Sequence, residues 1–201
     1  MPGGCGTWPA FWSNGPDWPN KGEIDIVEGV NNGPTNQVSI HTGPGCTIST
    51  DTSSAVGTLN GGPNCASYET GNMGCGMQDH KSDNSFGTSF NSAGGGVYAM
   101  KWDSSGISVY FFSRNEIPDD ITNGTPLPDN WHKPVAYYPA ATCNPYQFFK
   151  DNFAIINTTL CGDWAGSAGA WSGSGCAAST GVSTCEQYVR QNGQALNDAC
   201  E

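Results

Sequence analysis

The chain has few charged residues, few histidines and no long apolar run. Charged side chains make up only 12% of its 201 residues, and 7 Lys and Arg stand against 18 Asp and Glu, which gives a formal net charge of −11. This balance argues against nucleic acid or an anionic membrane as a partner, although an acidic surface that only aids solubility explains it equally well. No apolar stretch is long enough to span a bilayer, and no export signal is visible.

Long helical periodicity is also scarce, whereas the sequence has 28 Gly and 13 Pro. Short apolar segments separated by turn residues are typical of an all-β, loop-rich protein. The length suits one folding unit, and the sequence contains no internal repeat. We therefore predict a single all-β domain over residues 1–201.

The nine cysteines contain no CxxC pair, and the chain has only three His, so a zinc site is not favoured. A disulfide framework in a secreted, extracellular protein fits better, although the spacing leaves the pairing open and the odd number leaves at least one thiol. Asn123 and Asn157 begin two triplets that allow N-glycosylation. Because a disulfide-rich chain without an export signal is contradictory, we expect that an N-terminal segment precedes Met1.

One segment, GEIDIVEG, places the carboxylates Glu23, Asp25 and Glu28 among β-branched apolar residues, which favour a strand. Side chains alternate along a strand, so Glu23 and Asp25 face the same side and Glu28 has the opposite parity. A β-bulge at Ile26 and Val27 would turn Glu28 back to the side of the other two. We therefore predict three carboxylates on one face of a bulged strand.

This spacing suits the chemistry of sugar cleavage. The Cα atoms of Glu23 and Glu28 would lie roughly 13 Å apart, so two inward-leaning side chains can bracket a sugar ring. A retaining glycosidase needs carboxyl groups about 5–5.5 Å apart, one as nucleophile and one as acid/base. Asp25 between them should share a proton and help to keep one Glu protonated near neutral pH. An exposed acidic strand or a cation site is the alternative interpretation of the same residues.

The flanking residues add a resemblance to a known family. The segment WPAFW, which begins at Trp8, precedes the bulged motif E-I-D-I-V-E, and together they resemble the signature of glycoside hydrolase family 16. The match is best to fungal endo-1,3(4)-β-glucanases, or laminarinase-like enzymes. Further segments that resemble the family follow in order at residues 40–43, 94–99, 109–112 and 160–166.

The resemblance implies that Glu23 is the nucleophile, Asp25 a supporting carboxylate and Glu28 the general acid/base. It implies a concanavalin A-like jelly-roll β-sandwich of two antiparallel sheets, with a glucan cleft across the concave face. The implied enzyme is a monomeric retaining endo-β-glucanase that hydrolyses β-1,3 or mixed β-1,3/1,4 glucans, with no cofactor and no metal. A transglycosylase with the same carboxylates, or an inactive fragment that only binds β-glucan, are the alternatives.

Aromatic residues near this motif are candidates for substrate binding. Aromatic rings stack on sugar faces, but an unplaced Trp more often fills a core. The resemblance implies that Trp12 and Trp18 line the cleft and that Trp164 contacts sugar. We predict Trp8 as a core residue or as one that lies behind the site.

His41 lies on the next predicted strand, residues 38–42, where apolar and polar residues alternate. If this strand pairs with the carboxylate strand, His41 can reach Asp25 or the substrate. An exposed strand histidine is the alternative, and with the family resemblance we favour the cleft.

The chain also departs from the family pattern. Met1 corresponds to an interior position of the family domain, so several strands of a typical domain are absent. The last strand is cut where it should begin, at residues 197–201, and we therefore expect an incomplete sandwich. Because the family has an aromatic residue near position 200, Cys200 is the first candidate for the unpaired thiol.

Other elements follow from periodicity and turn residues. We predict a hairpin of strands 97–102 and 107–112, a strand at 153–160, and a short helix at 185–190 capped by Thr184. Regions rich in Gly, Ser, Asn or Pro are predicted as irregular: 43–96, 115–144 and 165–183. The first of these is expected to form one wall of the cleft.

Overall fold

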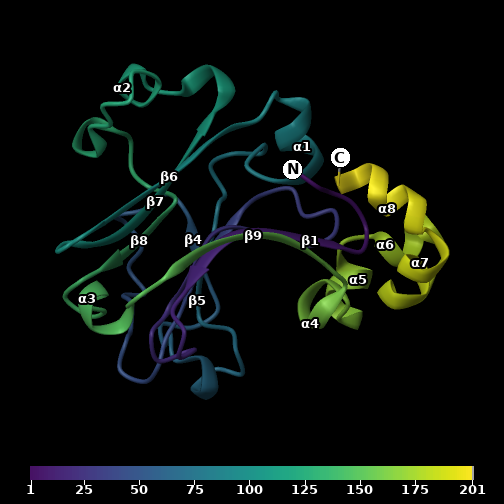
Figure 1. Ribbon diagram of the computed structural model, residues 1–201, viewed down its shortest axis with the longest axis horizontal. Coiled ribbons are helices and arrows are strands. Elements are labelled where there is room, and N and C mark those ends of the chain that lie inside the picture. Colours follow the sequence, from purple (N-terminus) through teal and green to yellow (C-terminus); the bar gives the residue numbers. More distant parts are fainter. Residues whose placement is uncertain (201) are drawn as a thin grey trace.

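The computed structural model describes residues 1–200, apart from the side chains of residues 195 and 198–200. Within this range the strands form two antiparallel sheets, with the orders β4-β5-β3-β2-β1-β9 and β6-β7-β8 (Figure 1). The strands are β1 (Thr7–Asn14), β2 (Glu23–Glu28), β3 (Gln37–His41), β4 (Thr58–Asn60), β5 (Cys75–Gln78), β6 (Gly96–Asp103), β7 (Gly106–Ser113), β8 (Ala136–Pro139) and β9 (Phe153–Leu160). The prediction of two antiparallel sheets is confirmed.

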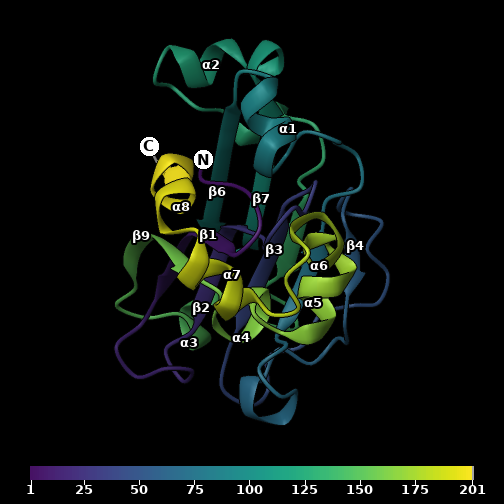
Figure 2. The same ribbon diagram turned by 90° about the vertical axis from the view of Figure 1, so that its right-hand side faces the viewer.

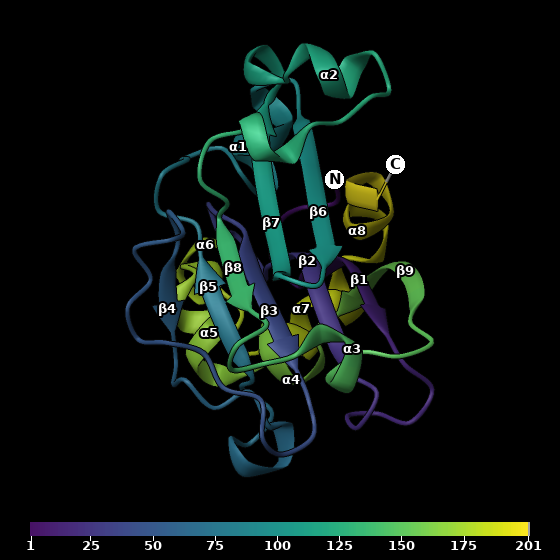
Figure 3. The ribbon, with the colours of Figure 1, turned by 90° about the vertical axis from the view of Figure 1, so that its left-hand side faces the viewer.

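The core lies between the two sheets, with the smaller sheet lying across one face of the larger one (Figure 3). Ile24 and Ile40 of the larger sheet and Val109 of the smaller sheet are fully buried. Tyr138 on β8 crosses the core, where its hydroxyl donates a 2.9 Å hydrogen bond to the backbone oxygen of Val38. Since side chains alternate along β2, the alternation that buries Ile24 turns the carboxylates to the opposite face of the larger sheet.

Strand β2 carries the predicted bulge. Asp25 pairs with Ser39 and Glu28 pairs with Gln37, so two residues of β2 lie opposite one residue of β3. The extra residue shifts the parity of the strand by one position, which brings Glu28 to the side of the earlier carboxylates. The bulge prediction is therefore confirmed.

Several other local predictions are confirmed as well. Strands β6 and β7 pair along their whole length and meet at Asp103 and Gly106, as expected for the hairpin. The predicted strand at residues 153–160 is β9. Helix α7 (Cys185–Gln191) begins after Thr184, whose side chain accepts a hydrogen bond from the backbone N–H of Gln187.

Two of the regions predicted as irregular contain strands. The stretch 43–96 contributes β4 and β5, and β5 lies in the sheet between β3 and β4. The stretch 115–144 contributes β8, an edge strand whose last residue is Pro139. The prediction was wrong because hydrogen bonds to neighbouring strands stabilise these short segments, and an edge position tolerates a terminal proline.

Short helices gather at one end of the larger sheet, beyond the ends of β1 and β9 (Figures 1 and 2). The stretch 165–183, predicted as a loop, contains two of these helices. A strand was expected to begin at residues 197–201, but residues 197–200 form the end of helix α8 (Gly193–Cys200). The remaining helices are α1 (Gly87–Ser92), α2 (Asp119–Thr122), α3 (Pro145–Phe148), α4 (Gly162–Ala165), α5 (Ala168–Gly173), α6 (Cys176–Thr180) and α8 (Gly193–Cys200), with 3-10 turns η1 (Ser67–Glu69), η2 (Arg114–Glu116) and η3 (Pro128–Asn130). In the described range, no helix has the length and apolar character needed to cross a bilayer.

The predicted disulfide framework is confirmed. Among the described side chains, four bonds are present: Cys5–Cys176, Cys46–Cys143, Cys65–Cys75 and Cys161–Cys185. The first and last tie the helical end to the start of the chain and to the residue after β9, where few apolar side chains are available for packing. The side chain of Cys200, the candidate for the unpaired thiol, lies outside the described residues.

Candidate active site

A cavity of about 620 Å³ opens on the face of the larger sheet that points away from the core. Its walls come from β1, β2, β3, β4, β9 and α4, and from the loop that precedes β5. The lining includes Trp8, Trp12, Glu23, Asp25, Glu28, His41, Asn72, Met73, Asn157 and Trp164. A smaller cavity of about 410 Å³, beside Asp79 and Phe111, contains none of the predicted site residues.

The three carboxylates of β2 all line the larger cavity. Asp25 and Glu28 are buried and Glu23 is half-buried. Burial raises the pKa of Glu23 to about 7 and the pKa of Glu28 to about 7. Burial, followed by the charges of Glu28 and Glu23, raises the pKa of Asp25 well above its ordinary value. The three carboxyl groups therefore keep protons to higher pH than free carboxyl groups do, which is the direction of the pKa change that the sequence predicts.

An indole ring donates a hydrogen bond to each of the two glutamates. Trp18 Nε1 lies 2.6 Å from Oε2 of Glu23, and Trp8 Nε1 lies 3.0 Å from Oε1 of Glu28. Both hydrogen bonds favour the ionised carboxylate and lower the pKa against the effect of burial. Each glutamate is therefore oriented by its own tryptophan.

The contact of Trp8 was not predicted, because that residue was expected in the core or behind the site. In the register of β1 and β2, Ala10 pairs with Glu28, so Trp8 lies two positions further along β1 on the same face. Diagonal neighbours at this spacing are within reach of long side chains. The pairing register would have revealed the contact, but the sequence does not give that register.

Trp12 and Trp164 line the cavity as expected. Trp12 pairs with Asp25 in the sheet, and its Nε1 donates a 2.9 Å hydrogen bond to Oδ1 of Asn157. Trp164 lies on α4 and packs edge-on against Trp8, with ring centroids 5.7 Å apart. Trp18 is not part of the cavity wall and contacts Glu23 instead. Sugar binding by these three tryptophans stays a prediction.

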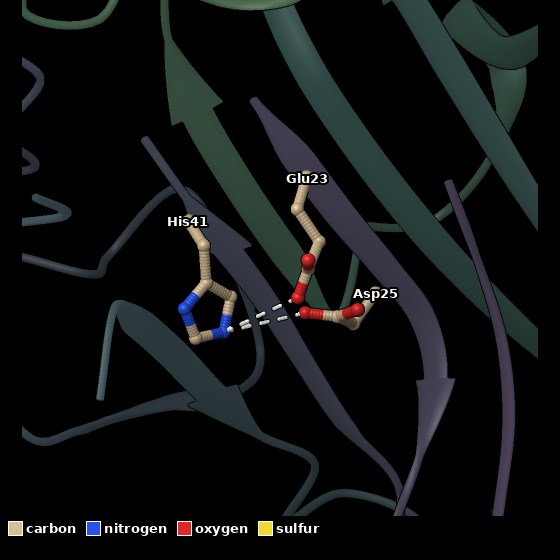
Figure 4. Close-up of side chains that lie close together, drawn as sticks. All are labelled: Glu23, Asp25 and His41. Carbon is tan, nitrogen blue, oxygen red and sulfur yellow. Dashed lines mark ion pairs between the residues drawn. The ribbon is translucent and has the colours of Figure 1, made fainter. Parts of the chain in front are cut away.

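His41 pairs with Glu23 across β2 and β3, which confirms its predicted place beside the carboxylates. Its Nε2 lies 3.5 Å from Oδ2 of Asp25 and 3.9 Å from Oε1 of Glu23 (Figure 4). Burial lowers the pKa of His41 to about 4, although a hydrogen bond with the Asn72 side chain raises it slightly. The imidazole is therefore neutral near pH 7, and these contacts are not ion pairs at that pH.

Two parts of the wall were missed by sequence reasoning. Asn72 and Met73 come from the stretch predicted as one wall of the cleft, but no pattern singled them out. Asn157 was noted only as a glycosylation acceptor, yet it lines the cavity on β9. The available signal was the alternation along the predicted strand 153–160, because Asn157 and Thr159 are polar residues two apart that share a face, and both line the cavity.

Comparison with known proteins agrees with this geometry. A family model described as an XgeA-like catalytic GH16 domain matches residues 1–200. The chain is 45% identical over 205 residues to a probable glycosidase of Schizosaccharomyces pombe, covering 99% of this chain and 46% of that protein. It is 41% identical to an endo-1,3(4)-beta-glucanase of Arthroderma benhamiae, covering 99% of this chain and 43% of that one. The chain thus spans about half the length of these relatives.

Solved structures resemble the fold over most of the chain. Laminarinase 16A from Phanerochaete chrysosporium, with β-glucans in its donor and acceptor sites, has a TM-score of 0.81 and 44% identity, covering 88% of this chain and 60% of that one. An elongating family 16 β-1,3-glucosyltransferase has a TM-score of 0.75 and 40% identity, covering 84% and 55%. The jelly-roll sandwich predicted from the sequence is the fold of these neighbours. The chain belongs to glycoside hydrolase family 16, with the XgeA-like catalytic domains.

Proposed function

We propose that this chain is the catalytic domain of a retaining endo-β-glucanase that hydrolyses β-1,3 and mixed β-1,3/1,4 glucans. The observation that carries the proposal is the bulge of β2, because it puts Glu23, Asp25 and Glu28 on the wall of one aromatic-lined cavity. The names of the glucanase relatives and the β-glucans bound to the laminarinase support the substrate class.

Glu23 acts as the nucleophile and Glu28 as the acid/base. The Glu23 carboxylate attacks the anomeric carbon, the bond to the leaving oxygen breaks, and Glu28 gives its proton to that oxygen. In the second step Glu28 takes a proton from water, the water oxygen attacks the anomeric carbon, and Glu23 is released. Both attacks invert the carbon, so the configuration is retained overall.

Burial raises the pKa of Glu23 and of Glu28 to about 7 alike, so the feature that favours this division of roles is the shorter tryptophan hydrogen bond at Glu23. A pKa of about 7 allows Glu28 to hold the proton that the leaving oxygen needs. The short hydrogen bond from Trp18 favours the ionised form of Glu23, which the nucleophile needs. Asp25 lies between them in the sequence, and the charges of Glu28 and Glu23 add to its burial in raising its own pKa.

The cavity suits a neutral polysaccharide. Trp12 and Trp164 offer aromatic faces for pyranose rings, and Asn72 and Asn157 offer polar groups for hydroxyls. The four disulfides among the described residues fit an oxidising compartment, so we place the enzyme outside the cell. That it acts as a monomer stays an expectation from the family resemblance.

Transglycosylation is the second candidate, favoured by the similarity to an elongating glucosyltransferase. The same carboxylates serve both reactions, and only the acceptor differs, since a sugar hydroxyl replaces water in the second step. Products longer than the starting oligosaccharide would identify this reaction.

The test measures reducing-sugar release from laminarin and barley β-glucan by the parent, Glu23→Ala and Glu28→Ala. Both variants should lose release while they keep the circular dichroism spectrum of the parent. Azide added with an activated glycoside then separates the roles. It should give an α-glycosyl azide with Glu23→Ala, by direct displacement, and a β-glycosyl azide with Glu28→Ala, through the Glu23 ester. The reverse pairing would overturn the assignment.

A further inference from the structure

Three side chains of the cavity bring their ligand atoms together from two strands. Glu23 and Asp25 come from β2 and His41 comes from β3, and their oxygens and Nε2 converge on one point (Figure 4). One ligand atom of each lies within 4.8 Å of the other two. Among the described residues, no other group of His, Cys, Asp and Glu side chains has this property.

The spacing of these atoms matches a small transition-metal ion. A zinc ion bound at about 2.0–2.2 Å in a tetrahedron has neighbouring ligands roughly 3.4 Å apart. Nε2 of His41 lies 3.5 Å from Oδ2 of Asp25 and 3.9 Å from Oε1 of Glu23. Shifts of a few tenths of an ångström would bring both of these distances to the tetrahedral spacing, and the third, between the Glu23 and Asp25 oxygens, is at most 4.8 Å.

An independent observation also points to a missing ligand. Asp25 is 3% exposed, and its Oδ2 atom is buried without a hydrogen-bond partner. A buried polar atom without a partner costs free energy, and a bound cation would supply that partner. Within the described part of the chain, no Lys or Arg forms an ion pair with any of the three β2 carboxylates.

The chemical type of the three ligand atoms, two carboxylate oxygens and one imidazole nitrogen, indicates which class of ion the site prefers. Imidazole suits zinc, copper and nickel, whereas sites for magnesium and calcium consist of oxygen ligands. The other ring nitrogen of His41, Nδ1, lies 3.4 Å from the hydroxyl of Ser67. Such an outer partner fixes the ring so that Nε2 faces the ion.

We propose that Glu23, Asp25 and His41 form a binding site for one divalent transition-metal ion, with Zn²⁺ as the representative, and that the bound ion blocks the enzyme. The ion would bind the carboxylate of Glu23, which would then no longer be free to attack the anomeric carbon. This blocking step rests on the proposed function, whereas the binding of the ion does not. The sequence analysis expected no metal and did not favour a zinc site, so this proposal departs from that expectation.

The experiment titrates the metal-free chain with ZnCl₂ by calorimetry and follows Co²⁺ by its visible absorption as a second readout. The test variants are His41→Gln and Asp25→Asn, which keep the size of the side chains. The matched control is His132→Gln, because His132 is exposed and lies outside the cavity. Circular dichroism and melting temperature verify that each variant is folded.

We expect one Zn²⁺ per chain and a raised melting temperature in the parent and in His132→Gln. Affinity should fall in the test variants by at least the roughly 10- to 100-fold that loss of an outer partner costs. A folded parent that binds no Zn²⁺, or equal affinity in His41→Gln and His132→Gln, would overturn the site.

Laminarin hydrolysis with and without Zn²⁺ tests the blocking step. The rate should fall with the occupancy measured by calorimetry and return when EDTA is added. Full activity at saturating Zn²⁺ would overturn the blocking step alone. A metal-free parent without activity would overturn the proposed function, while the calorimetry would still decide the binding site.

Discussion

The indole Nε1 of Trp18 lies 2.6 Å from Oε2 of Glu23, the shorter of the two hydrogen bonds that tryptophans donate to the glutamates of the site. Trp18 packs edge-on against Tyr68, with ring centroids 5.7 Å apart, so the donor is held in place. This relationship makes Trp18 a positioning residue for Glu23, the proposed nucleophile.

Trp18→Phe should remove the donor and keep the ring against Tyr68. Because the hydrogen bond favours ionised Glu23, its loss should raise the pKa of that carboxyl and move the acidic limb of the kcat/KM profile to higher pH. A hydrogen bond to a charged group is worth about 1.5–3 kcal/mol, so the acidic limb should move by about 1–2 pH units. Trp12→Phe is the control, since its donor contacts Asn157. An acidic limb that moves equally in both variants would contradict the prediction.

Trp8→Phe should affect the opposite limb. Trp8 donates a hydrogen bond to Glu28, and loss of this hydrogen bond should raise the pKa of Glu28. As the proposed general acid, Glu28 must be protonated to act. The basic limb of the kcat/KM profile should therefore move to higher pH, while the acidic limb stays in place. The measurement is the same pH series as for Trp18→Phe, and a shift of the acidic limb would assign the nucleophile role to Glu28 instead.

Glu28→Gln should make the protein more stable at alkaline pH. The unfolded chain loses the Glu28 proton near the ordinary pKa of 4.5, whereas the folded chain keeps it up to about pH 7. The folded state therefore binds more protons between these values, and its stability falls as the pH rises through that window. Glutamine removes this fall, so the variant should gain about 2–4 kcal/mol relative to the parent between pH 4.5 and pH 8.

Urea denaturation at the two pH values measures this gain. Glu116→Gln controls for the loss of one formal charge, because Glu116 is exposed on η2 and outside the catalytic cavity. That control should change the stability by about 0.5 kcal/mol or less at either pH. An equal effect of Glu28→Gln at both pH values would show that the proton affinity of Glu28 is not altered by folding.

Removal of the Cys46–Cys143 and Cys65–Cys75 disulfides should lower the free energy of unfolding by different amounts. The Cys46–Cys143 bond closes 97 residues and the Cys65–Cys75 bond closes 10, so the chain-entropy model predicts losses of about 4.7 and about 2.7 kcal/mol. The short loop carries Asn72 and Met73 of the cavity wall, so its double alanine variant should also raise KM for laminarin. Denaturation curves and kinetics of both double variants test this, and a larger KM effect from the long-range bond would contradict it.

The two glycosylation triplets should be used unequally when the protein is secreted from a eukaryotic host. Asn123 is exposed after α2 and is not part of the cavity lining, whereas Asn157 lines the cavity and is hydrogen-bonded to Trp12. A glycan on Asn157 would fill the place of the substrate. Peptide mass spectrometry should find glycan on Asn123 and unmodified Asn157. Full occupancy of Asn157 in an active preparation would contradict the placement of the substrate.

The sequence by itself determined the features that depend on neighbouring residues. The parity of Glu23, Asp25 and Glu28, with one bulge between them, is a property of six consecutive residues. The β6–β7 hairpin and the Thr184 cap are equally local, because a turn or a cap needs only a few adjacent residues. His41 could be placed as well, since consecutive strands commonly pair.

Only the tertiary structure decided the features that depend on residues far apart in the chain. The contact of Trp8 with Glu28 requires the register of β1 against β2, and the register is set by packing over the whole sheet. Strand β5 and helix α6 have weak local signals and form because sheet neighbours or a disulfide to Cys5 hold them. The register that sets His41 opposite Glu23 is likewise decided by packing over the sheet, although the sequence predicted that His41 lies near the carboxylates.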